Sequence, residues 1–379
     1  MLFLSRVYLQ IMGGKLLFLV FVIIFSDLAS QTHPTYLYNL SYHRGFILPH
    51  RSSLAYIINQ HISEYTIESS KQLNDSSKWH QLYRFPYWGG GFYYSNLENN
   101  SYTGKVYAMY SKIDIPIWLK NYSTVHYSMA AGLAYLTKHF NISDNYYNIA
   151  IGSSVNAYIN FGLYYSRYFG KTRLSTGFSF THYSNGAWKK PNLGFNVPSL
   201  FINIGYHTNY PQVSKPQAKP NKNVKPFYLY DLMLSMGTRQ NYAADPNHYI
   251  VNNLAFTLEK QVSLKRKWGV GIDVFYDPSI PIRHQKIPDF NQYIPYVRSG
   301  LRLSHDLILN RLSISFQTGS YFYDPFLPDG YIYSKVGLKY NINNWLRANL
   351  LLKSHFFKAD VIEFGISIYH PLKTNNKVE

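Results

Sequence analysis

The chain has no cysteine among its 379 residues, which excludes a disulfide-stapled fold, a zinc site built on thiolates and a cysteine-linked lipid anchor. After residue 30 it also lacks any uninterrupted apolar run long enough to cross a bilayer as a helix. Charged residues are few, at 15%. These absences argue against a small disulfide-rich domain and against a bundle of membrane helices.

The N-terminus carries a targeting signal. Arg6 and Lys15 precede the apolar run LLFLVFVIIF at 16–25, and the small residues Ala29 and Ser30 follow it. This order is typical of a secretory signal peptide, so we expect residues 1–30 to be removed by cleavage near Ser30. An uncleaved N-terminal membrane anchor is the alternative.

The charge balance is basic, with 37 Lys and Arg against 19 Asp and Glu and a net charge of +18. An exported basic protein meets few nucleic acids, so we expect no nucleic-acid partner. The phosphates of lipids are the more natural acidic partner. Many of the cations are scattered, as they would be in solvated loops and turns.

Aromatic residues are abundant, with 38 Tyr and 24 Phe, and apolar residues alternate with polar ones along the chain. Side chains of a strand point to opposite faces in turn, so this period of two predicts strands with one apolar and one polar face. In one case Leu232, Leu234 and Met236 alternate with Asp231 and Ser235. Aromatic girdles and a polar lumen are typical of outer-membrane barrels.

The alternation predicts an all-β fold, an antiparallel transmembrane β-barrel of about 12 to 16 strands, with residues 31–379 as a single barrel domain. A soluble sandwich would alternate too, but here the polar faces mix glycine with charge as a barrel lumen does. Closing the sheet removes its edges and satisfies the backbone in lipid. The candidate strands are 36–46, 54–68, 88–97, 103–116, 124–138, 147–168, 171–184, 196–210, 227–240, 247–263, 266–277, 294–307, 310–322, 329–341, 345–357 and 360–370.

Residues 211–226, PQVSKPQAKPNKNVKP, interrupt this pattern. They cannot form a central strand, because each proline removes a hydrogen-bond donor from the ladder. Alternation resumes directly after them. We therefore interpret the segment as a long flexible loop and not as a domain boundary.

The tripeptide HYS occurs twice, and the two copies fall on different faces. In 171–184, His182 and Ser184 share the apolar parity, which is the lipid-facing one, where polar side chains cost free energy. Asn196 begins the next strand on the same face, and antiparallel pairing across the hairpin loop 185–195 can bring it opposite His182 and Ser184. In the first copy, His126 and Ser128 lie on the lumen parity, so we interpret that copy as structural.

Three polar groups that converge on the outer wall suggest a serine hydrolase. Ser184 would attack an ester carbonyl, and His182 would take its proton and return it to the leaving alcohol. Asn196 would orient the imidazole. Asn185, through its side chain, and the Gly186 amide could donate to the oxyanion. The alternative is a polar turn at the membrane interface, because H-x-S is common by chance.

With these residues in hand, the chain resembles the lipid A 3-O-deacylase (PagL-like, acyloxyacyl hydrolase) family of outer-membrane β-barrels. The stretch that carries the resemblance is His182-Tyr183-Ser184-Asn185, followed by Lys190-Pro191-Asn192 and Gly194. The resemblance implies a His base, a Ser nucleophile and an oxyanion role beside Asn185. The family's third member is a Glu twelve residues after the Ser, and here that position is Asn196.

Outer-membrane phospholipase A is similar over the same stretch. Its pattern H-x-S-N-G with an Asn twelve residues after the Ser matches His182, Ser184, Asn185, Gly186 and Asn196. The turn around Pro191 is more like that of the deacylases, and no set of calcium-binding positions is evident in the sequence.

The prediction is an outer-membrane serine esterase that removes an acyl chain from lipid A in lipopolysaccharide, without a cofactor or metal. Lys189 and Lys190 could meet lipid A phosphates, or they could belong to a solvated loop. The alternatives are an outer-membrane phospholipase A, which a calcium requirement would favour, and a non-catalytic porin or structural barrel, which would conduct ions.

Overall fold

The computed structural model describes residues 34–49, 52–58, 60–75, 77–99, 101–212, 226–243, 245–283, 294–325, 329–356 and 358–372. The expected signal peptide at 1–30 and most of the proline-rich segment lie outside these residues. No helix in the described part of the chain is long and apolar enough to cross a membrane.

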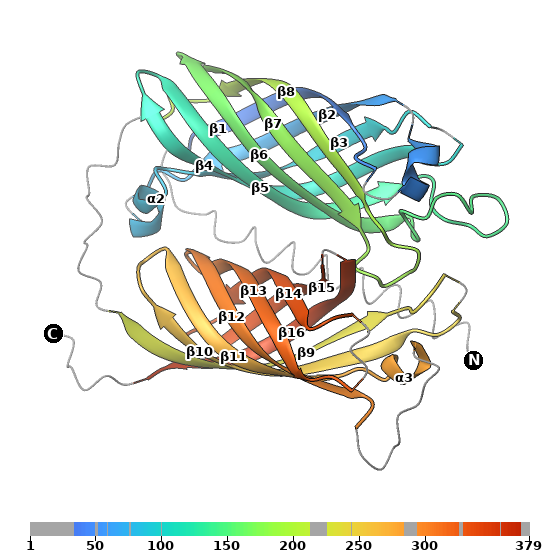
Figure 1. Cartoon of the computed structure of the whole chain (residues 1–379). Helices are drawn as coiled ribbons and strands as arrows, with labels where there is room; N and C mark the ends of the chain where they lie inside the picture. The colour runs from blue at the N-terminus through green and yellow to red at the C-terminus, as the bar shows by residue number, and fades with distance from the viewer. Residues whose placement is uncertain are drawn as a thin grey trace, which may run out of the picture.

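The described strands close into two antiparallel barrels of eight strands each, drawn one above the other in Figure 1. The first barrel consists of β1 (Tyr36–Phe46), β2 (His61–Gln72), β3 (Tyr87–Asn96), β4 (Lys105–Lys120), β5 (Ser123–Leu136), β6 (Val155–Phe169), β7 (Thr172–Ser184) and β8 (Phe195–His207). The second consists of β9 (Phe227–Arg239), β10 (Tyr249–Gln261), β11 (Arg266–Tyr276), β12 (Val297–Leu309), β13 (Leu312–Tyr323), β14 (Ile332–Asn341), β15 (Leu346–His355) and β16 (Lys358–Pro371). The described parts of the connections include three short helices: η1 (Ser52–Ile57), α2 (Lys78–Leu82) and α3 (Ile280–Arg283).

The antiparallel barrel class is confirmed. The described strands number sixteen, but they close into two barrels of eight and not into the expected single barrel of about 12 to 16. Strand β8 pairs back with β1, for example at Leu37 and His207, and β16 pairs back with β9 at Phe364 and Met236. The segment 211–226 therefore joins two barrels and marks the boundary that we did not expect there. Alternation continues on both sides of it because each barrel has the same two-faced strands.

The predicted faces are confirmed. Asp231 and Ser235 of β9 are buried inside the second barrel, whereas Leu232, Leu234 and Met236 are exposed on its outer wall. The same alternation runs through most strands of both barrels, so both outer walls are apolar. Lipid is the environment that suits such walls.

The lumen of the second barrel is filled by paired charges, since an eight-stranded barrel leaves room for little more than side chains. Lys335 contacts both Asp273 and Glu363 at 3.2 Å, and Lys339 lies 3.2 Å from Glu259. Five buried carboxylates face five buried cations in this described network: Asp231, Glu259, Asp273, Asp306 and Glu363 with Lys267, Arg302, Lys335, Lys339 and Arg347. The two sets balance in charge and close the lumen.

Tyrosine fills much of the first barrel. Tyr93, Tyr110, Tyr158 and Tyr183 are buried and lie ring against ring, with the centroids of Tyr110 and Tyr158 4.9 Å apart. Part of the unusual tyrosine content therefore serves the lumen and not the membrane interface. Buried aromatic rings fill volume there, and their hydroxyls can reach polar partners.

The connections differ at the two ends of the barrels. At one end most turns are short, as between β4 and β5 or β12 and β13, although the β2–β3 connection that carries α2 is longer. Most loops at the other end are longer, as between β7 and β8, β9 and β10, and β13 and β14. Short periplasmic turns and long extracellular loops are typical of outer-membrane barrels, so the long-loop end faces outward. The barrels touch at both ends: Tyr83 Oη donates to the Ile308 carbonyl at 2.6 Å near the short turns, and Gln240 N donates to the Ala187 carbonyl at 3.1 Å near the loops.

Candidate active site on the outer wall of the first barrel

His182, Ser184 and Asn196 lie together at the extracellular ends of β7 and β8. His182 and Asn196 are directly opposite in the strand register. His182 Nδ1 lies 2.7 Å from Asn196 Oδ1, and His182 Nε2 lies 2.9 Å from Ser184 Oγ. A carbonyl oxygen can only accept, so Nδ1 carries the proton and Nε2 is left to accept from the serine hydroxyl.

This group is on the outer face of the barrel wall. His182 and Ser184 share the parity of Leu174 and Phe178, which are both exposed. Ser184 itself is only 5% exposed. Gly186, two residues after Ser184, packs against Ile362 of β16. A Cβ built on this glycine would be 2.2 Å from the Ile362 Cγ1 atom. The second barrel therefore covers part of the wall beside the serine.

Gly194 supports the histidine ring from the far side of the β7–β8 loop. Its φ of +80° favours glycine, and a Cβ there would lie 2.7 Å from His182 Cε1 and 2.9 Å from the Tyr183 carbonyl oxygen. The Gly194 N–H donates to the Ala150 carbonyl at 2.9 Å. The ring of His182 thus packs directly against the backbone of Gly194.

Asn185 differs from its expected oxyanion role, because its donors are already engaged. Its side-chain Nδ2 donates to Ser153 Oγ at 2.9 Å and to the Lys189 carbonyl at 2.8 Å. Its backbone N–H donates to Asn192 Oδ1 at 2.9 Å. Asn185 is therefore an anchor that ties the β7–β8 loop together and attaches it to the β5–β6 loop. Sequence reasoning missed Ser153, which lies at no motif spacing from the serine. It named Asn192 only within the stretch that carries the family resemblance, without this role.

The Gly186 amide remains the candidate oxyanion donor. Within the described residues its N–H has no hydrogen-bond acceptor, and it lies two residues from Ser184. Gly186 and Ala187 both adopt positive φ, at +65° and +69°. Two successive residues in this conformation turn the chain sharply after Ser184. Such turns can direct backbone N–H groups toward an anion.

Lys189 and Lys190 follow in the same loop, with Lys189 exposed and Lys190 partly buried. Burial, together with the nearby positive charges of Arg239 and Lys358, lowers the pKa of Lys190 to about 8. Lys190 is therefore mainly charged at neutral pH and loses its charge in mild alkali.

The first HYS copy is arranged differently. His126 is fully buried in the lumen, where its Nδ1 lies 2.8 Å from Asp114 Oδ1 and its Nε2 contacts Thr124 Oγ1. Asp114 also pairs with Arg173 at 3.3 Å. The histidine is thus part of a buried polar network, which agrees with its interpretation as structural.

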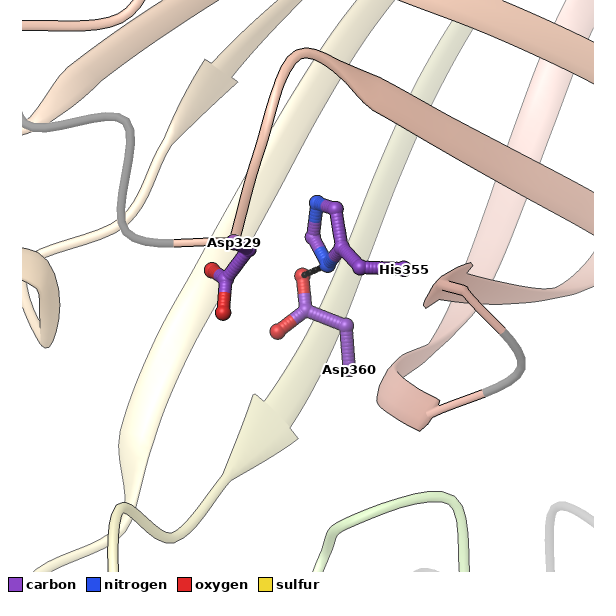
Figure 2. A group of neighbouring side chains, drawn as sticks. All are labelled: Asp329, His355 and Asp360. Atoms are coloured by element: carbon purple, nitrogen blue, oxygen red, sulfur yellow. Dashed lines mark ion pairs between the residues drawn. The ribbon is translucent and has the colours of Figure 1, made fainter.

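A group of possible metal ligands lies at the extracellular mouth of the second barrel. Figure 2 shows the side chains of Asp329, His355 and Asp360 pointing toward one another, with ligand atoms within 4.8 Å. Both carboxylates already have cationic partners, however. Arg298 lies 3.2 Å from Asp329, and Lys353 lies 2.9 Å from Asp360. The group is better described as a set of ion pairs at the extracellular end of the second barrel than as a metal centre.

Family models match both barrels. Residues 67–207 match "Lipid A 3-O-deacylase (PagL)", and residues 228–373 match "Acyloxyacyl hydrolase, C-terminal domain". Together the two matches cover most of the chain. The chain belongs to the lipid A 3-O-deacylase family. Membership makes it an acyl hydrolase of the outer membrane, which agrees with the apolar outer walls of both barrels.

Solved structures with a similar fold include the outer membrane enzyme PagL, with 18% identity, 44% of this chain and 97% of that chain covered, and a TM-score of 0.30. The Salmonella typhi outer membrane phospholipase (OMPLA) dimer with bound calcium matches with 11% identity, 90% of each chain and a TM-score of 0.18. At these values the two structures assign no residue of this chain a role. No curated protein matches the chain.

Proposed function

We propose that the chain is an outer-membrane serine esterase that removes an ester-linked acyl chain from lipid A in lipopolysaccharide. The observation that carries the proposal is the bridging position of His182, which contacts Ser184 Oγ through Nε2 and Asn196 Oδ1 through Nδ1. Nucleophile, base and orienting group are therefore in hydrogen-bonding contact before substrate arrives.

In the proposed reaction, Ser184 Oγ attacks the ester carbonyl carbon while its proton passes to His182 Nε2. The carbonyl oxygen becomes an oxyanion, and the Gly186 N–H donates to it. Collapse of this intermediate breaks the bond to the sugar oxygen, which takes the proton from His182. Water then attacks the acyl-serine by the same proton transfers in reverse order, which releases the fatty acid and restores the serine.

Asn196 takes the third position of the triad in this proposal. Its amide oxygen holds the tautomer and orientation of His182, but it brings no negative charge to the imidazolium that forms. The stabilisation of that charge is weaker than with a carboxylate, so the oxyanion contact and the position of the serine carry more of the rate.

The place of the site suits a lipid of the outer leaflet. It lies on the outer wall, at the end with the long loops, so a lipid can reach it by lateral diffusion. Lys189 and Lys190 lie in the adjoining loop, and a cation near the membrane surface adds attraction for phosphate groups. Lipid A carries phosphates beside its ester-linked acyl chains, which is why we favour it as the substrate.

An outer-membrane phospholipase A is the second candidate, because an Asn at the third position fits that family's pattern. A porin is less consistent with the fold. The lumen of the second barrel is filled by five pairs of opposite charges, and that of the first by tyrosines. Eight-stranded barrels filled in this way differ from the wide, water-filled lumen of a porin.

The test is mass spectrometry of lipid A and of phospholipid after incubation with the refolded full chain, in calcium and in EDTA. Loss of one acyl chain from lipid A in both buffers would support the deacylase, and cleavage of phospholipid only in calcium would support the phospholipase instead. Replacing Ser184→Ala should abolish either activity.

The matched control is Ser128→Ala, because Ser128 is the serine of the other HYS copy and lies in the lumen of the same barrel. It should retain the wild-type activity. If Ser184→Ala cleaves as fast as the wild type, or no ester is cleaved by the wild type, the proposal fails.

A further inference from the structure

One residue of the second barrel holds the loop that follows Ser184. Gln240, directly after β9, donates its backbone N–H to the Ala187 carbonyl at 3.1 Å, and its side-chain Oε1 accepts from the Lys190 N–H at 2.7 Å. The β7–β8 loop belongs to the first barrel, so these two bonds cross from one barrel to the other.

The segment that Gln240 holds is strained. Gly186 and Ala187 both have positive φ, and Ala187 is a residue with a Cβ in a conformation that such residues rarely adopt. A strained backbone persists only where its surroundings fix it. Ala187 is fully buried, and its carbonyl is one of the two groups that Gln240 binds.

Gln240 is itself fixed. It is only 6% exposed, and its Nε2 donates to the Asp245 carbonyl, so both ends of the side-chain amide are engaged. A second contact between the same two loops reinforces it, because the rings of Trp188 and His248 lie 6.1 Å apart. Gln240 and His248 therefore support the loop that carries the candidate oxyanion donor.

We propose that Gln240 is a positioning residue for the ester hydrolysis at Ser184, so that the second barrel is part of the catalytic unit. By fixing Ala187 and Lys190 it holds the Gly186 N–H where the oxyanion of the transition state forms. The inference rests on the proposed function of Ser184 as the nucleophile. It goes further in assigning a role in that reaction to the second barrel.

The experiment compares Gln240→Met with Gln72→Met in the full chain. Methionine keeps the length of the side chain and removes its hydrogen bonds. Gln72 is a close match: it is buried, and its side chain also makes two bonds to a loop backbone, at 2.9 and 3.0 Å to Gln212. It lies at the opposite, short-turn end of the first barrel, away from Ser184.

We expect Gln240→Met to lower kcat about threefold to tenfold with KM almost unchanged, because an oxyanion contact is made only in the transition state. Gln72→Met should leave kcat and KM at wild-type values. Gln240→Glu keeps an acceptor for the Lys190 N–H but loses the donor to the Asp245 carbonyl, so it should recover part of the lost kcat.

Three outcomes would overturn the inference while the wild type remains active: an unchanged kcat in Gln240→Met, an equal loss in Gln72→Met, or a loss confined to KM. A wild type without esterase activity would overturn the proposed function instead, and the role of Gln240 with it. Heat-modified migration on gels verifies that all variants are folded before the rates are compared.

Discussion

The side chains of His182 and Asn196 meet across two neighbouring strands, with His182 Nδ1 2.7 Å from Asn196 Oδ1. The two residues are directly opposite in the register of β7 and β8. The register of the sheet therefore brings the orienting amide to the histidine ring, and the β7–β8 loop packs against the ring at Gly194. An amide in this position fixes the ring without adding a charge to the apolar wall.

Replacing Asn196→Ala should lower kcat about fivefold to a hundredfold, because the partly buried His182 Nδ1–H loses its Asn196 acceptor and the ring loses its orientation. Steady-state kinetics on purified lipid A would measure the effect. The control is Asn203→Ala on the same strand, since Asn203 faces the lumen and binds Ser41 at 2.8 Å. Equal rates for both variants would show that Asn196 has no part in catalysis.

Replacing Gly194→Ala should cost at least tenfold in kcat, because the new Cβ would lie 2.7 Å from His182 Cε1 and must displace the ring. Gly170→Ala is the matched control: its φ is also positive, at +60°, but its Cβ would approach no atom closer than 3.9 Å. Both variants place a Cβ at a positive φ, so a difference in rate between them reports on the contacts of the Gly194 Cβ with His182 and with the Tyr183 carbonyl oxygen. Similar rates would contradict the packing described for the ring.

The binding of phosphorylated substrate should weaken as the pH rises through about 8. Burial lowers the pKa of Lys190 to about 8, so its positive charge is present below that pH and lost above it. The apparent KM should rise about fivefold between pH 7 and pH 9, since one cation near the membrane surface contributes roughly 1 kcal/mol toward an anionic lipid. Lys190→Arg should remove the rise because arginine stays charged, and a dephosphorylated substrate should not show it. A pH-independent KM in the wild type would rule out phosphate binding by Lys190.

The charge network inside the second barrel should be sensitive to the loss of one member. Asp273 is fully buried and contacts Arg302 at 2.8 Å and Lys335 at 3.2 Å. Asp273→Ala leaves these cations partly unpaired and should lower the free energy of unfolding by about 3–5 kcal/mol. Urea unfolding of the refolded protein measures the change. Asp144→Ala in an exposed loop is the control and should fall within about 0.5 kcal/mol of the wild type.

Much of this structure follows from alternation. Apolar Leu232 beside charged Asp231 predicts which side chain meets lipid and which meets the lumen, and the structure agrees. The same parity, with a hairpin between the strands, placed Asn196 opposite His182. These predictions succeed because they depend on neighbours in sequence and on a period of two.

Closure could not be predicted in the same way. The pairs Leu37 with His207 and Phe364 with Met236 decide that there are two barrels, and both join strands far apart in the chain. Strands at a closing seam have the same two faces as any other, so the pattern does not mark where a sheet closes. The proline-rich segment 211–226 was the only local trace, and a loop within one barrel would have the same composition.

The details of the β7–β8 loop were also beyond the sequence. Asn185 has the amide that an oxyanion donor needs, but its hydrogens go to Ser153 and Lys189, which only the folded loop brings within reach. Gln240 lies more than fifty residues from Ser184 and in another barrel. No motif spacing relates it to the serine.

The even number of strands in each barrel has a consequence for how the two are oriented. A chain that crosses the membrane eight times returns to the side on which it started, so β1 begins and β8 ends at the same rim, and so do β9 and β16. The connection between β8 and β9 never has to cross the bilayer, and the second barrel inserts with the same polarity as the first. If the chain crossed the membrane once more or once less between Ser184 and β9, Gln240 would lie on the opposite side of the membrane from Ser184.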